Sequence, residues 1–148
     1  MAINTKKVVV AGLAAGVVLN ILDFVIHMVL GAQMTAEANA FKPGLGDAME
    51  TMSGGTMAGY IIMDLIIGML LAYTYAAMRP RFGAGPKTAI ITALVFWIFA
   101  SILTSNYLMM GMMSRSLWLT VGFAYLVCII IASLVAGALY SEDSAVTA

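Results

Sequence analysis

The sequence contains few charged residues, and this scarcity argues against a soluble protein. Only 9% of its 148 residues are Asp, Glu, Lys or Arg, while 63% are hydrophobic. A soluble globular domain needs about 25% charged residues to cover its surface. The seven basic and seven acidic residues cancel, so the chain also lacks the positive excess with which proteins bind nucleic acid. We therefore expect a protein whose main partner is the lipid bilayer.

Cysteine, histidine and the motifs of catalysis are equally scarce. The single cysteine, Cys128, excludes a disulfide framework and a cysteine-based metal motif, and we expect it to act as a small apolar residue. The single histidine, His27, cannot provide both axial ligands of a haem. The sequence has no nucleophile elbow, P-loop, HExxH or dinucleotide-binding fingerprint. These absences predict a protein that is not an enzyme and carries no cofactor.

What the sequence does contain is four long apolar runs, separated by short polar or glycine-rich breaks. Each run reaches the roughly 20 residues that an α-helix needs to cross about 30 Å of hydrocarbon. The strands of a membrane barrel are shorter and alternate in polarity, so these runs are helices. We expect an all-α fold, an integral membrane four-helix bundle that forms one transmembrane domain over residues 1–148. The expected spans are residues 8–30, 57–77, 88–110 and 116–140.

Basic residues concentrate on one side of the expected bundle. Two precede the first span and three lie in the short connection 78–87, whereas the longer connection 31–56 has one basic and three acidic residues. Because Lys and Arg next to spans stay in the cytoplasm, we expect both termini and the loop 78–87 there. The basic side chains would anchor the chain to anionic headgroups. They are Lys6, Lys7, Arg79, Arg81 and Lys87.

The connection 31–56 is then an outer loop. Its "KPGLGD" segment is a turn by its Pro and Gly content. The "DAME" segment that follows has the form of a capping box, with Asp47 as N-cap and Glu50 three residues later. We expect a short helix there and a cap over the bundle. At the opposite end of the second span, Pro80 is expected to end the helix.

The two halves of the chain resemble each other weakly. Aligning the first and third spans by their preceding lysines places Asn20 and Asp23 opposite Ser101 and Thr104. Aligning the second and fourth spans gives Gly-aromatic starts in both. This pattern favours two helical hairpins related as parallel repeats.

Small residues mark the faces on which the spans meet one another. Gly12 and Gly16 form a GxxxG pair, which lets another helix backbone approach closely. At 100° per residue the same stripe of the first span continues through its polar residues. Small-residue faces on the second and fourth spans also invite helix partners, in a homo-oligomer or a larger membrane complex. These faces contain Gly68, Ala72, Ala132 and Ala136.

Polar residues of all four spans concentrate in one layer in the outer half of the membrane, with Thr120 in the outer turn of the fourth span. The other residues of this layer are Asn20, Asp23, His27, Tyr60, Asp64, Ser101, Thr104 and Ser105. One interpretation is structural: Asp23 and His27 pair one helical turn apart, and the other side chains close a hydrogen-bond network. A second is an ion or proton site, since buried Asp and His recur in translocation paths.

A third interpretation of this layer is a metal site. Asp23, His27 and Asp64 supply two carboxylates and one imidazole, which suit Zn²⁺ or another divalent ion. Methionine offers a variation, because ten of the thirteen methionines map to the outer half and thioethers select Cu(I). Methionine is also a common apolar filler. The ten are Met28, Met34, Met49, Met52, Met57, Met63, Met109, Met110, Met112 and Met113.

Two segments carry a resemblance to other proteins. The segment "YAAMRPRFGAGPKTAIITAL", residues 75–94, resembles a cytoplasmic loop of uncharacterised small four-span bacterial inner-membrane proteins. Similar chains carry an Asn-x-x-Asp-x-x-x-His pattern in the first span, here Asn20, Asp23 and His27. The resemblance implies a bacterial inner-membrane location and a four-helix layout. It implies no activity.

Together these patterns predict a non-catalytic integral membrane protein. It would act as an accessory or assembly subunit, or as a bundle that associates with itself. The alternative is a small membrane protein that handles an ion, a proton or a metal such as Zn or Cu through the outer Asp and His residues.

Overall fold

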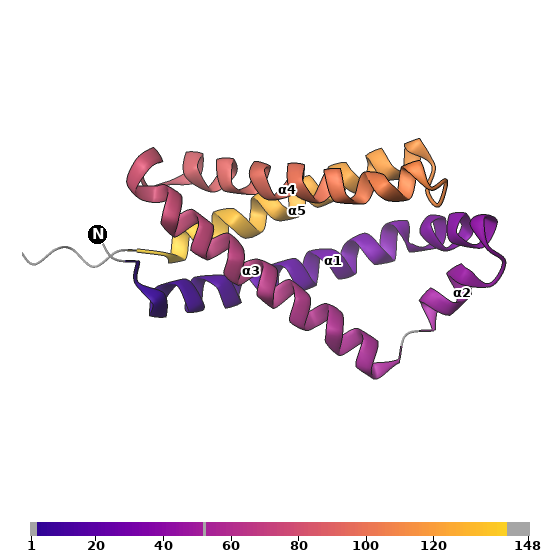
Figure 1. Ribbon diagram of the computed structural model, residues 1–148. Helices are drawn as coiled ribbons and strands as arrows, with labels where there is room; N and C mark the ends of the chain where they lie inside the picture. Colours follow the sequence, from indigo (N-terminus) through magenta and orange to yellow (C-terminus); the bar gives the residue numbers. More distant parts are fainter. Residues whose placement is uncertain (1–2, 52, 142–148) are drawn as a thin grey trace, which may run out of the picture.

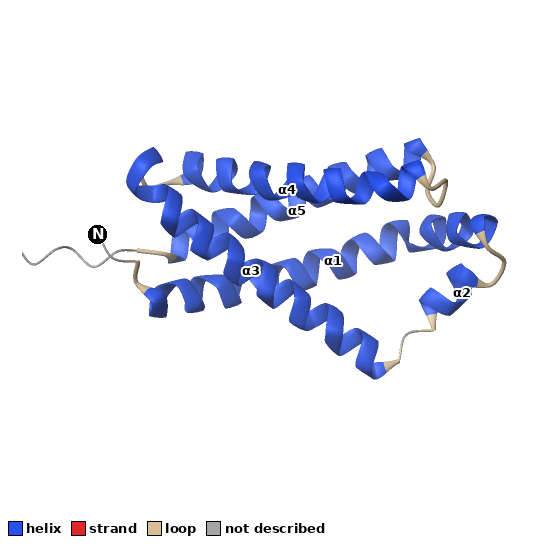
Figure 2. Ribbon diagram, viewed as in Figure 1, coloured by secondary structure: helices blue, strands red, loops and turns tan. Residues whose placement is uncertain are grey.

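The computed structural model describes residues 3–51 and 53–141, which form five helices (Figure 1). Figure 2 shows that the described chain contains helices and loops but no strand. Four of the five helices are long and apolar enough to cross a membrane. The predicted all-α four-helix membrane bundle is therefore confirmed, and the chain is a multi-pass membrane protein. The helices are α1 (Thr5–Phe41), α2 (Leu45–Glu50), α3 (Gly54–Phe82), α4 (Pro86–Met109) and α5 (Arg115–Leu139).

The bundle has two distinct ends (Figure 1). The start of α1, the end of α5 and the turn between α3 and α4 lie together at one end, which we call the terminal end. The other end holds α2 and the turn between α4 and α5, and we call it the α2 end. Met52 and residues 142–148, which include the predicted cytoplasmic C-terminus, lie outside the described residues.

Much of the expected outer loop 31–56 is helical. Helix α1 continues past residue 30 to Phe41, because its last turns contain four alanines with one Gln, one Met and one Glu, which are all good helix formers, and no proline. Helix α2 then begins after Gly44, whose φ of 83° is left-handed. Asp47 therefore lies in the first turn of α2 and not at its N-cap. Its carboxylate accepts a hydrogen bond from Asn39 of α1 (2.9 Å), so the expected capping box does not form.

The turn between α3 and α4 also differs from the expectation. Helix α3 continues through Pro80 to Phe82, because a proline this close to the end removes only one hydrogen bond from the last turn. The chain reverses at Gly83, with φ of 87°, and Pro86 is the first residue of α4. The amide of Gly85 donates to the hydroxyl of Tyr75 (2.9 Å), which fixes the turn against α3.

Glycines hold α1 and α3 together at their crossing. A Cβ atom added to Gly16 would lie 2.6 Å from the Cα atom of Leu65, and one added to Gly68 would lie 2.6 Å from the Cα atom of Gly16. Both distances are shorter than any real side chain tolerates. The two backbones therefore touch, as the GxxxG pattern of Gly12 and Gly16 leads one to expect.

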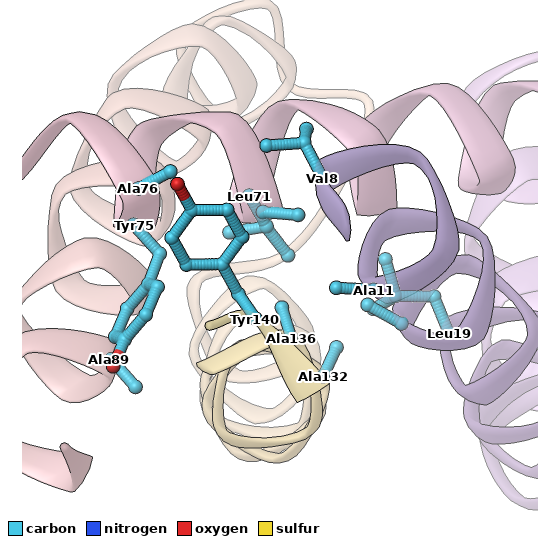
Figure 3. Packing of buried hydrophobic residues seen from close by; sticks show 12 residues of the cluster. Val8, Ala11, Leu19, Leu71, Tyr75, Ala76, Ala89, Ala132, Ala136 and Tyr140 are labelled. Carbon is cyan, nitrogen blue, oxygen red and sulfur yellow. The ribbon is translucent and has the colours of Figure 1, made fainter. Parts of the chain in front are cut away.

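The buried core lies almost entirely in the terminal half of the bundle, and Figure 3 shows how its side chains pack together. It is built mostly from alanines, so four helices approach closely around two tyrosines. The rings of Tyr75 and Tyr140 pack edge to face, with their centres 6.2 Å apart. The guanidinium of Arg79 lies 5.8 Å from the centre of the Tyr140 ring. Arg79 thus packs against protein at the terminal end. The core residues are Val8, Ala11, Ala15, Leu19, Leu71, Ala72, Tyr75, Ala76, Ala89, Ala132, Ala136 and Tyr140.

Toward the α2 end, α3 separates from the other long helices. Residues 54–67 of α3 and 94–109 of α4 include no buried residue. Figure 1 shows the first turns of α3 far from α1, whereas α4 and α5 stay together. The hairpin α1–α3 is thus an open crossing and the hairpin α4–α5 a close pair. The two hairpins do not pack alike, and the internal repeat stays a prediction.

Candidate functional site

A polar pair joins α1 to α5 near the middle of the bundle. The hydroxyl of Tyr125 donates a hydrogen bond to the Asp23 carboxylate, and both side chains are partly buried. Tyr125 lies near the centre of α5, about 15 Å along the helix from Arg115 at 1.5 Å per residue. At this depth the bilayer offers no hydrogen-bond partner, so the pair satisfies two groups that lipid would leave unpaired.

Asp64 of α3 adds a second carboxyl group to this pair. Its side chain interacts electrostatically with Asp23 and with Tyr125, and it is only partly buried. All seven Lys and Arg residues lie at helix ends or in turns. Two carboxyl groups and one phenol, from three helices, thus lie near enough to influence one another electrostatically in the apolar layer, without a Lys or Arg side chain among them. We call Asp23, Asp64 and Tyr125 the carboxyl cluster.

Asn20 lies one turn before Asp23 and ties α1 to α3. Its amide nitrogen donates to the carbonyl oxygen of Gly16 (3.0 Å) and to that of Ile61 (3.3 Å). Both acceptors are backbone oxygens, one on each helix. Asn20 therefore holds the two helices beside the carboxyl cluster, and its amide donors are already used.

His27 does not join the carboxyl cluster. The expected pair with Asp23 does not form, because Asp23 accepts from Tyr125 on α5 while the His27 side chain is exposed and lies beside Gly31. In residues 3–51 and 53–141 no three His, Cys, Asp or Glu side chains gather closely enough to hold a metal ion. The geometry therefore does not assemble the metal site expected from Asp23, His27 and Asp64.

The hydroxyl groups of α4 are also absent from the carboxyl cluster. Thr104 donates to the carbonyl of Ala100 (2.9 Å), and Ser105 donates to that of Ile102 (2.7 Å), both within α4. Ser101 lies on the same helix. Helix α1 packs against α2, α3 and α5 but not against α4. The four-helix polar layer expected from depth is thus a three-helix cluster.

Sequence reasoning missed the residues that α5 contributes. Tyr125 completes the carboxyl cluster, and Cys128, three residues later on the same face, interacts electrostatically with Asp23. A signal for Tyr125 did exist. Membrane tyrosines concentrate at the two interfaces, so a tyrosine near the middle of a span needs a partner for its hydroxyl.

A cavity of about 220 Å³ lies at the α2 end, between α1, α2 and the first turns of α3. Two contacts dock α2 against α1 beside it: Thr35 donates to the Glu50 carboxylate (2.8 Å), and the amide of Gly46 donates to Asn39 (2.7 Å). Eight of the residues that line the cavity carry polar or sulfur-bearing side chains. They are His27, Met34, Thr35, Met49, Glu50, Thr51, Thr56 and Tyr60.

A second contact at this end links α1 to the start of α5. The Glu37 carboxylate accepts from the backbone amide of Ser114 (2.6 Å) and from its hydroxyl (2.5 Å). The Ser114 hydroxyl in turn accepts from the amide of Leu117 and caps α5. This contact keeps α1 and α5 together at the end where α3 departs.

Comparisons of this chain with family models, with curated proteins and with solved structures gave no match. The resemblance of residues 75–94 to small bacterial inner-membrane proteins therefore stays a prediction.

Proposed function

We propose that this chain is a non-catalytic membrane protein that binds other transmembrane helices with the open half of its bundle. It would do so as an accessory or assembly subunit, or by pairing with a second copy of itself. The observation that carries the proposal is the position of the carboxyl cluster at the place where α3 leaves α1 and α5. Lipid tails cover apolar side chains well, but they provide no partner for an aspartate.

The small-residue faces that first appeared available to partners are already used inside the chain. Ala72, Ala132 and Ala136 are fully buried, and Gly68 lies against Gly16. The terminal half therefore has no free small-residue face of this kind among these positions. This moves the proposed partner surface to the α2 half, where α3 carries large exposed apolar residues such as Ile62 and Ile66 beside Asp64.

We also propose that the terminal end faces the cytoplasm of a bacterial inner membrane. Lys6, Lys7, Arg79, Arg81 and Lys87 belong to that end, and basic residues next to spans are retained on the cytoplasmic side. The α2 end carries Glu37, Asp47 and Glu50. The carboxyl cluster then opens toward the outer leaflet. The bacterial location is supported by the resemblance of the turn between α3 and α4.

Site-specific photo-crosslinking in bacterial membranes tests the partner surface. Ile62 and Tyr73 are both on α3 and are both 55% exposed, but Ile62 lies in the α2 half and Tyr73 in the terminal half. We expect a photoreactive residue at Ile62 to give a protein adduct, with a second copy or with another membrane protein, and one at Tyr73 to give none. Equal protein adducts from both positions, or lipid adducts alone, would contradict the proposal.

The contribution of the carboxyl cluster is tested in the same assay. We expect Asp64→Asn to reduce the adduct formed from Ile62, because a partner group that binds the carboxylate loses its charge-assisted bond. Asp47→Asn is the matched control, since the Asp47 side chain is exposed and lies outside the carboxyl cluster. An unchanged adduct in Asp64→Asn would remove this aspartate from the interface.

The second candidate function is the handling of a proton or small cation by the carboxyl cluster. Two carboxyl groups brought together in an apolar layer are stabilised by a shared proton or a bound cation, and the Tyr125 hydroxyl adds a third exchangeable group. We expect such a protein to carry a pH-dependent flux in liposomes that Asp64→Asn abolishes and Asp47→Asn leaves intact. A wild-type protein without flux, or a flux that survives Asp64→Asn, would exclude this candidate.

A further inference from the structure

We propose that the cavity at the α2 end is a Cu(I) site whose ligands are His27, Met34 and Met49. This site is separate from the carboxyl cluster and goes beyond the proposed binding of helices. Its chemistry follows from the ligands: thioethers select the soft Cu(I) ion, and imidazole is a good copper ligand. Zn²⁺ prefers Cys, His, Asp and Glu, and no three of these converge in residues 3–51 and 53–141.

The first two ligands come from one face of α1. His27 and Met34 are seven residues apart, two helical turns, and both line the cavity. Gly31 lies between them and has no side chain to fill this space. A Cβ atom placed there would lie 3.8 Å from Cδ2 of His27, so the imidazole extends along the helix toward the cavity.

The imidazole of His27 is free to bind a ligand. In the described part of the chain it takes part in no hydrogen bond, although Thr35 and Glu50 of the same cavity are bonded to each other. Its side chain is exposed. A histidine that serves a structural role commonly has its ring nitrogens engaged by a carboxylate or carbonyl, as in a hydrogen-bonded core.

The third ligand, Met49, comes from α2 and faces the same cavity. Helix α2 is short, but the Thr35–Glu50 and Asn39–Gly46 hydrogen bonds hold it against α1. Met49 is therefore positioned before any ion binds, which lowers the cost of assembling a site. It is also 50% exposed, so its thioether sulfur is accessible to an ion. The Glu50 carboxylate lines the cavity and offers negative charge to a cation.

Competition for Cu(I) with a coloured chelator, in detergent and under a reductant, tests the site. We expect the wild type to take one Cu(I) per chain from the chelator. The double variant Met34→Leu/Met49→Leu should bind about tenfold more weakly or worse, because loss of even an outer-shell partner of a metal costs this much. Leucine conserves the volume of methionine, so the fold is kept. His27→Ala should weaken binding in the same way.

Two controls make the outcome decisive. Met109→Leu/Met110→Leu removes two other exposed methionines from the α4 end of the turn to α5, and it should bind Cu(I) as the wild type does. All proteins are also measured with Cys128→Ala, because a thiol would bind Cu(I) by itself. Wild-type protein that does not compete with the chelator, or a Met34/Met49 variant that binds equally well, overturns the proposal. Neither result affects the crosslinks expected from Ile62.

Discussion

The two halves of this bundle are built on different principles, although the same four long helices pass through both. In the terminal half, glycine and alanine let four backbones meet, and the few large side chains are locked between them. In the α2 half, α3 and α4 contain no buried residue, the carboxyl cluster lies at its border, and the cavity and most of the methionines lie within it. Close packing is the main force that joins helices in lipid. The terminal half therefore carries the stability of the bundle, and the α2 half is left free to bind.

The largest effect is expected from one methyl group added at the tight crossing of α1 and α3. We expect Gly68→Ala to destabilise the protein by about 1–3 kcal/mol, as overpacking does in a core, because the new Cβ atom would meet the Cα atom of Gly16 at 2.6 Å. Reversible unfolding in mixed micelles of mild detergent and dodecyl sulfate measures this change.

The matched control is Gly59→Ala on the same helix. No atom lies within 4 Å of a Cβ added at Gly59, and alanine is the better helix former by about 1 kcal/mol. We expect this variant to be as stable as the wild type or slightly more so. Equal destabilisation by the two substitutions would show that the halves are packed alike.

A smaller effect is expected at the boundary between the halves. Tyr125→Phe removes the hydroxyl that Asp23 accepts from and leaves the ring in place. Hydrogen bonds between membrane helices are worth about 1 kcal/mol, and we expect a loss of this size in the same unfolding experiment. Asp23→Asn and the double variant complete a mutant cycle, whose coupling energy isolates the contact from other effects.

Tyr107→Phe is the control for this change. Tyr107 is on α4, and its side chain is 49% exposed. We expect the Tyr107→Phe variant to be as stable as the wild type. A coupling energy of zero between Asp23 and Tyr125, or an equal loss in Tyr107→Phe, would mean that the contact does not hold α1 to α5.

The sequence predicted best what depends on single helices. The four spans follow from the length of the apolar runs, and the contact at Gly12 and Gly16 follows from two small residues four apart. The limits of α1 were harder to predict, because hydrophobicity falls after residue 30 while the helix continues to Phe41. A change of polarity marks where a chain leaves the membrane, not where its helix ends.

The carboxyl cluster could be predicted only in part, because the sequence gives the depth of a residue in the membrane but not its position in the membrane plane. Asp23, Asp64 and Ser101 were placed at one level from their positions along the spans. Of these, only Asp23 and Asp64 lie near enough to interact electrostatically, since α3 packs against α1 and α4 does not. Tyr125 joins them because α5 lies beside α1. The packing of the whole bundle determines which helices are neighbours and how each helix is rotated. The sequence of a single span therefore does not predict these two properties.

The smallest effect is expected at Thr104 on α4. Thr104→Val removes a hydroxyl that was placed in the polar layer by depth but that bonds to Ala100 within its own helix. Because an exposed intrahelical bond adds little, we expect a change in unfolding free energy within about 0.5 kcal/mol. The same variant should leave the photo-crosslink from Ile62 and the liposome flux unchanged. A clear loss of the crosslink or of the flux would show that Thr104 of α4 contributes to the site. It would also mean that the α2 half closes around the carboxyl cluster when the protein functions.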